Sequence, residues 1–187
     1  SNGNGFSYNT YSTDYGFGGL NVAPTTNEAK VRPITGIGES DYSLSAFSGS
    51  SRLCFATTIK TPSNLSDATN SYDIAHGFFT GGSWLPSRYA ILFYHHATNG
   101  GKWQARVKES SETVADTGVT VETGTWYNMR VEMNTTSILF YINDSLVATI
   151  STNLPTGGGI GPQFQHYLKG GTPRSTHLHF QELFFRP

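Results

Sequence analysis

Charged residues are scarce in this chain, and neither sign dominates. Asp, Glu, Lys and Arg make up 13% of the 187 residues, and the formal net charge is −1. Nucleic-acid-binding proteins usually carry a basic surface, so we expect no nucleic-acid partner. No apolar run is long enough to span a bilayer and no signal peptide is recognisable, so we expect no membrane insertion either.

Cysteine is almost absent. The only one, Cys54, lies in the strand-like run 52–59, so no disulfide can form within the chain. This argues against a secreted animal module held together by disulfides. A free cysteine in an apolar strand is more often a buried, inert thiol than a nucleophile, and we expect that here.

Leu, Ala, Lys and Glu are sparse, whereas Gly, Ser, Thr and Asn are abundant. This balance disfavours helices and predicts an all-β protein. The length suits one sandwich domain spanning residues 1–187. Residues 1–20 form an aromatic-rich lead-in, whose rings either cover the sandwich edge or contact a neighbouring subunit or a sugar. These rings are Phe6, Tyr8, Tyr11, Tyr15 and Phe17.

Residues 124–155 carry the clearest strand signals. From Trp126 to Met133 the side chains alternate apolar and polar, as in a strand with one buried face. Residues 137–142 are apolar on both faces, which predicts a central strand covered from both sides. Asn143, Asp144 and Ser145 tolerate turn conformations and predict a hairpin into residues 146–150.

The same segment resembles a known fold. A Gly-Thr-Trp-Tyr opening, then Met-Arg-Val-Glu, Phe-Tyr-Ile-Asn, Leu-Val-Ala-Thr and Asn-Leu-Pro resemble the second half of a concanavalin A-like, or laminin G-like, jelly-roll domain. The segment is similar to the lectin-like module that recurs in bacteriophage tail fibres and tail-associated proteins. The resemblance implies a homotrimer on the virion surface, or otherwise extracellular, that binds cell-surface glycans. The alternatives are a structural cap of a fibre or capsid and a polysaccharide lyase or hydrolase.

Other strands are expected over residues 30–37, 42–47, 53–59, 72–80, 88–96, 102–108, 162–168 and 175–186, with residues 109–122 as a further meander. Alternation in the last two strands places a polar set on one exposed sheet face, with three arginines as candidates to join it. The set is Gln163, Gln165, Tyr167, His177, His179 and Gln181, and the arginines are Arg88, Arg106 and Arg130. Amide, imidazole and guanidinium groups suit hydroxyl-rich or acidic ligands. A solvated surface and a subunit interface remain equally open interpretations.

Trp84 lies in the Gly- and Pro-rich loop 81–87. A tryptophan there is either a plug over the core or a stacking platform for a sugar ring. We include it among the candidate ligand-binding residues.

The sequence lacks the features of two other site types. Sandwich-type β-glucan hydrolases carry Glu-x-Asp-x-x-Glu, and no such strand occurs here. Residues 163–169 resemble the motifs of sandwich-type lyases only faintly, so we predict that the chain is not an enzyme. His177 and His179 could share a metal, but two ligands are too few, so we predict no metal and no cofactor.

Overall fold

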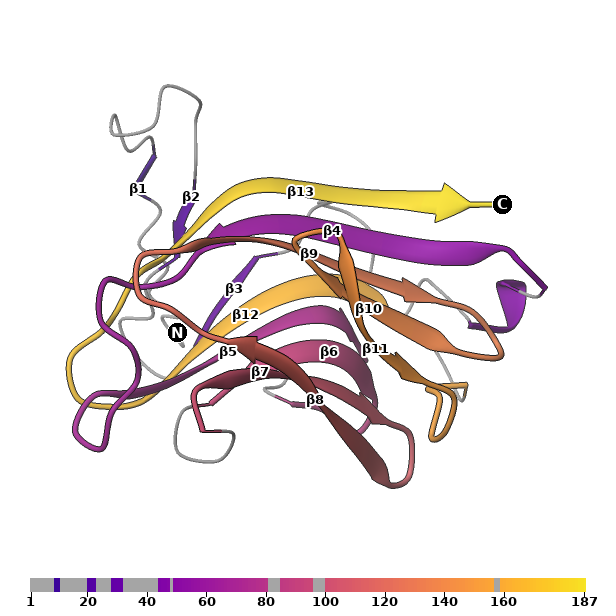
Figure 1. The fold of residues 1–187 in the computed structure, drawn as a ribbon, viewed down its shortest axis with the longest axis horizontal. Coiled ribbons are helices and arrows are strands. Elements are labelled where there is room, and N and C mark those ends of the chain that lie inside the picture. Colours follow the sequence, from indigo (N-terminus) through magenta and orange to yellow (C-terminus); the bar gives the residue numbers. More distant parts are fainter. Residues whose placement is uncertain are drawn as a thin grey trace, which may run out of the picture.

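A computed structural model of the chain describes residues 9–10, 20–22, 28–31, 44–47, 49–80, 85–95, 100–156 and 159–187. They form a sandwich of two antiparallel sheets (Figure 1). The seven-stranded sheet has the order β1-β2-β13-β4-β9-β10-β11, and the six-stranded sheet has the order β3-β12-β5-β6-β7-β8. The all-β prediction is confirmed, whereas the single-domain assignment stays a prediction.

The strands of the seven-stranded sheet are β1 Asn9–Thr10, β2 Leu20–Val22, β4 Arg52–Lys60, β9 Trp126–Met133, β10 Ile138–Ile142, β11 Ser145–Ile150 and β13 Thr176–Arg186. Those of the six-stranded sheet are β3 Glu28–Val31, β5 Ser71–Phe79, β6 Tyr89–Tyr94, β7 Lys102–Lys108, β8 Glu112–Thr120 and β12 Gly161–Gly170. The described residues contain one 3-10 turn, Leu44–Ala46, and no helix long enough to cross a membrane.

Aromatic side chains fill the space between the sheets. Trp103 packs against Tyr94 and Tyr127, with ring centroids 5.8 and 5.7 Å apart, and all three are buried. Phe55 and Phe140 add further fully buried rings from the seven-stranded sheet. Burying each such ring contributes about 2–3 kcal/mol of hydrophobic stabilisation, which pins the two sheets together.

The hairpin predicted after β10 is confirmed. Asn143 and Asp144 have φ values of 50° and 62°, the left-handed pair that a tight two-residue turn requires. The backbone N–H of Asn128 donates to Asn143 Oδ1 at 2.9 Å, which fixes the turn against β9. Double coverage of β10 is only partly confirmed, because Leu139 and Tyr141 are half-buried on the outer face.

The face that the six-stranded sheet turns away from its partner is also largely buried. Its strands bow toward the seven-stranded sheet, so this outer face is concave (Figure 1). A second apolar cluster lies on it, with Leu85 packed against the cluster. The cluster consists of Ala75, Phe79, Tyr89, Ile91 and Phe93.

A β-bulge in β13 changes which side chains face the interior. Leu178 pairs with Ile59 and Phe180 pairs with the next residue, Thr58. His179 is therefore the extra residue of the bulge, with no partner on β4. After the bulge Gln181 lies opposite the inward-facing Thr57, not on the outer face. The uninterrupted alternation expected over 175–186 is therefore wrong beyond Leu178.

Three other expectations need revision. Residues 44–46 form a 3-10 turn, not part of a strand over 42–47. The meander expected over 109–122 is one strand, β8. Of the strand expected over 30–37, only the first two residues belong to β3, and residues 32–37 lie outside the described part of the chain. The five aromatic residues of the lead-in also lie outside it.

Candidate functional site

The polar set predicted to share one face is divided between the two sheets. Gln163, Gln165 and Tyr167 lie on β12, in the six-stranded sheet, whereas His177 and His179 lie on β13, in the other sheet. The prediction of a shared face is thus wrong, because alternation assigns a side of one strand and not a neighbouring strand.

Gln163 and Gln165 lie on the concave outer face but are not exposed, contrary to expectation. Both are buried, and Gln165 Nε2 donates to Gln163 Oε1 at 2.7 Å. Tyr167, two residues further along β12, is half-buried and lies opposite Asp73 of β5. A ligand that enters this face therefore meets Tyr167 before the two glutamines.

The three arginines lie at separate places. Arg88 pairs with Glu109 (Nε to Oε1, 3.0 Å). The Arg106 guanidinium lies 4.2 Å from the ring centroid of Phe93 on the concave side. Arg130 belongs to β9, in the opposite sheet. Trp84 lies outside the described residues.

A cluster that the sequence analysis missed lies beside Tyr167. Asp73 of β5 is fully buried on the concave face; its Oδ1 contacts His95 Nδ1, and its Oδ2 lies 3.0 Å from Lys169 Nζ. Burial raises the pKa of the Asp73 carboxyl, and the two neighbouring bases oppose this shift. The sequence signal was available: Asp73 alternates with Tyr72 and Ile74, so it had to point away from the core.

The chemistry of this cluster is that of an oriented base. A neutral His95 that donates its Nδ1 proton to Asp73 carries its lone pair on Nε2. Tyr167 adds a hydroxyl from the adjacent strand, and Lys169 adds a cation. The concave face thus combines a proton acceptor, a proton donor and a positive charge.

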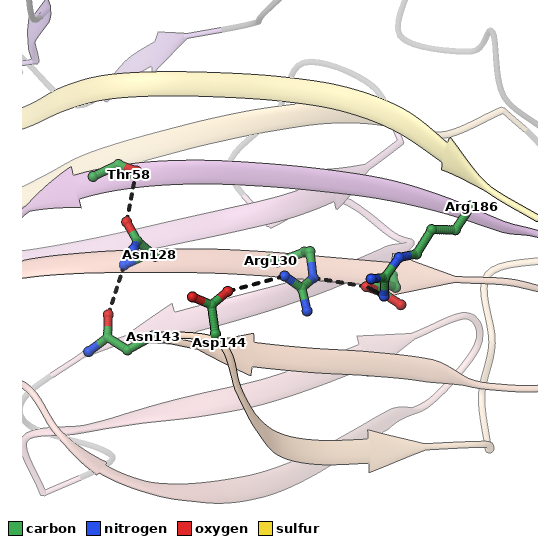
Figure 2. Close-up of polar contacts among 7 residues, drawn as sticks. Thr58, Asn128, Arg130, Asn143, Asp144 and Arg186 are labelled. Atoms are coloured by element: carbon green, nitrogen blue, oxygen red, sulfur yellow. Dashed lines mark hydrogen bonds and ion pairs between the residues drawn. The ribbon is translucent and has the colours of Figure 1, made fainter.

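The outer face of the seven-stranded sheet carries a different network (Figure 2). Glu132 is buried and receives Arg130 Nε at 2.8 Å and Arg186 Nη1 at 2.9 Å. The Arg130 guanidinium also reaches Asp144 at 3.4 Å and stacks 4.0 Å from the ring centroid of Tyr141. The two arginines and the two carboxylates of the network balance one another in charge. The hollow beside it measures only about 210 Å³. We assign this network to stability.

His177 lies in a larger pocket at one end of the sandwich. The pocket measures about 600 Å³ and is bounded by the β4–β5 loop, the β12–β13 loop and Gly124. His179 lies outside the lining, 6.0 Å from Trp126 in an edge-to-face contact. Within the described ranges no three His, Cys, Asp or Glu side chains are placed to hold a metal. The absence of a metal stays a prediction.

The paired antiparallel sheets place the protein in the concanavalin A-like jelly-roll class, and solved structures agree. The family 7 alginate lyase A1-II′ matches with a TM-score of 0.61 and 11% identity, over 97% of this chain and 86% of that chain. Alginate lyase AlyC3 matches with a TM-score of 0.64 and 7% identity, over 89% and 75%. A β-glucanase of Bacillus licheniformis matches with a TM-score of 0.55 and 15% identity, over 100% and 89%.

The sequence identifies the particular family. Residues 34–176 match the family described as SO2946-like, C-terminal domain, and the chain belongs to it. No curated protein matches the sequence. At such low identities the solved structures show a shared fold alone.

The prediction that the chain is not an enzyme is contradicted by this comparison. Several of the matching structures are polysaccharide lyases. The prediction relied on the missing carboxylate pair of the hydrolases and on the faint match of residues 163–169 to lyase motifs. A lyase needs a base and an acid but no such pair, so the missing motif was no ground for excluding an enzyme.

Proposed function

We propose that the protein binds or processes carbohydrate on the concave face of its six-stranded sheet. The observation that carries the proposal is the cluster of Asp73, His95 and Lys169 beside Tyr167. Burying a carboxylate costs stability, so a protein that keeps one beside a histidine often uses the pair. Such clusters therefore often mark functional sites. The alginate lyases that share the fold favour an acidic polysaccharide as substrate.

A lyase reaction fits the groups present. In β-elimination from a uronate, a base removes the C5 proton, the C4–O bond breaks, and a C4–C5 double bond forms. We assign proton removal to His95 Nε2, because Asp73 orients the ring through Nδ1. The Tyr167 hydroxyl supplies the proton that the leaving oxygen needs, and Lys169 stabilises the negative charge that develops.

The test is incubation with alginate and with polygalacturonate, following the ultraviolet absorbance of the unsaturated product. Tyr167→Phe and His95→Gln should each lower the rate about 100-fold or more, because each removes one proton-transfer group. Tyr141→Phe, on the opposite sheet, is the control and should leave the rate unchanged. If the wild-type protein forms no product, processing is ruled out. If Tyr167→Phe and Lys169→Gln then both retain alginate in affinity electrophoresis as well as wild type, binding at this face is ruled out too.

We further propose, on the resemblance to phage fibre modules, that this activity serves host attachment. The protein would then be a homotrimer on the virion surface or otherwise extracellular, with a cell-surface glycan as its partner. Light scattering that returns a trimer mass, together with retention on host cells, supports this role. A monomer that binds no glycan favours the structural cap of a fibre or capsid.

A further inference from the structure

The end pocket is basic although the protein as a whole is close to neutral. Lys60, Arg174 and His177 are the titratable residues in its described lining, and no carboxylate lies among them. The remaining lining is rich in hydroxyl and amide groups, contributed by Thr61, Ser63, Asn64, Asn70, Thr172 and Ser175. Such a surface matches a ligand that has both a negative charge and many hydroxyls.

Arg174 has a donor that the described residues leave unsatisfied. Its Nε is buried and has no hydrogen-bond acceptor among them. Its Nη2 lies 3.8 Å from Asp67 Oδ2, a weak ion pair with a half-exposed carboxylate. A buried guanidinium donor without an acceptor is costly, and a carboxylate ligand would satisfy it.

The pocket walls are held in place before any ligand arrives. The Thr172 N–H donates to Asn70 Oδ1 at 2.9 Å, which ties the β12–β13 loop to the β4–β5 loop. Thr61 Oγ1 donates to the Glu122 carbonyl at 2.5 Å and accepts the Thr125 N–H at 3.0 Å. These bonds join the segments that meet at the left of Figure 1, so binding would cost little loop ordering.

An aromatic surface continues from the pocket. Lys60 Nζ lies 5.8 Å from the ring centroid of Trp126, and the same ring meets His179 edge to face. Trp126 is half-buried, so part of it faces solvent. Aromatic faces stack on the C–H faces of sugar rings.

We propose that this pocket at the end of the sandwich is a binding site for a carboxylate-bearing saccharide, separate from the Asp73 cluster on the concave face of the six-stranded sheet. The sugar carboxylate would pair with Arg174 and Lys60, and its hydroxyls would bond the amide and hydroxyl lining. Only the choice of a saccharide as ligand depends on the proposed function. The charge requirement follows from the pocket itself.

The test measures binding calorimetrically with three probes: an oligogalacturonate, neutral maltotriose and inorganic sulfate. The oligogalacturonate should bind, and maltotriose and sulfate should each bind at least about tenfold more weakly. Arg174→Gln and Lys60→Gln should each weaken oligogalacturonate binding roughly tenfold or more, the usual effect of losing a charge-assisted hydrogen bond. Lys102→Gln removes the same charge from β7, where Lys102 pairs with Asp116, and should change nothing.

Three outcomes would overturn the inference. Sulfate binding as tightly as the oligosaccharide would show an anion site without sugar recognition. Equal binding of maltotriose would remove the charge requirement. Binding lost in Tyr167→Phe but kept in Arg174→Gln would move the ligand to the concave face, which would leave the proposed function standing. A failed lyase or alginate-retention test would not affect the pocket measurements.

Discussion

The outer faces of the two sheets differ in how far their charged and amide side chains are shielded from water. On the six-stranded sheet, Asp73, Gln163 and Gln165 are buried beside a second apolar cluster. On the seven-stranded sheet, Glu132 is covered mainly by arginines that themselves reach solvent. The first face is shielded from water, and the second is solvated at its rim.

This difference suggests a different role for each outer face. Charges enclosed at low dielectric interact strongly and are expensive to keep, so they persist where they are used. Charges that remain near water contribute modestly and are easily replaced. We therefore place the proposed chemistry on the concave face, and assign the Arg130 network of Figure 2 to stability.

The largest expected effect comes from removing a ring on each face. Phe79, 1% exposed, belongs to the second apolar cluster, and Tyr141 is half-buried under Arg130. Phe79→Ala should lower the free energy of unfolding by about 3–5 kcal/mol, because it leaves a cavity. Tyr141→Ala should cost about 1–2 kcal/mol, because water fills part of the space. Urea denaturation measures both, and equal losses would contradict the difference in shielding.

The next effect tests how closely β5 and β6 approach. A Cβ added to Gly77 would collide with the backbone of Ala90, and Gly77 has a φ of 147°. Gly77→Ala should therefore cost about 2–3 kcal/mol, a typical overpacking penalty. Gly49→Ala is the matched control: Gly49 also has a positive φ, of 66°, but a Cβ there meets nothing within 4 Å. It should cost only about 1 kcal/mol of backbone strain. Similar losses would show that conformation, not crowding, matters at Gly77.

A histidine buried between the two sheets should make the stability of the protein depend on pH. His76 is fully buried between Phe55 and Thr57, and burial lowers its pKa from 6.5 to about 3. Between pH 6.5 and about 3, His76 is therefore protonated in the unfolded chain but neutral in the folded chain. Stability is complete above about pH 6.5 and should fall by about 1.4 kcal/mol per pH unit below it.

Chemical denaturation at several pH values measures this slope. In His76→Leu the slope between pH 6.5 and about 3 should be smaller by that amount. An unchanged slope would mean that His76 does not carry the acid sensitivity.

The smallest effect concerns the solvated face. Glu132→Gln removes the charge that Arg130 and Arg186 share, and should cost about 1 kcal/mol, since the Arg186 side chain is half-exposed. Asp144→Asn should cause no measurable change, because that side chain is 82% exposed. Thermal unfolding would compare them. A loss for Glu132→Gln as large as that for Phe79→Ala would contradict the assignment of this face as solvated.

Local chemistry was enough to predict the hairpin and the alternation of β7 and β9. Asn143 and Asp144 adopt left-handed backbone readily, and this preference needs no distant contact. Burial alternates along β7 as the sequence predicts.

Contacts between distant segments were not predictable in this way. Asp73 lies on β5, Lys169 lies on β12, and His95 directly follows β6, so only the sheet order makes them neighbours. Gln163 was assigned to the correct side of its strand, but alternation cannot tell whether that side is covered. Gln181 was misplaced because a bulge leaves no mark in the pattern of residue types.

The burial of Cys54 gives the protein an internal reporter. The thiol lies on β4 between β9 and β13, with no exposed surface, and burial raises its pKa to about 12. A thiol in that state barely reacts with alkylating reagents, so labelling should wait until the strands separate. Because no second cysteine competes for the reagent, the labelling rate of the wild-type chain measures directly how often the middle of the seven-stranded sheet opens.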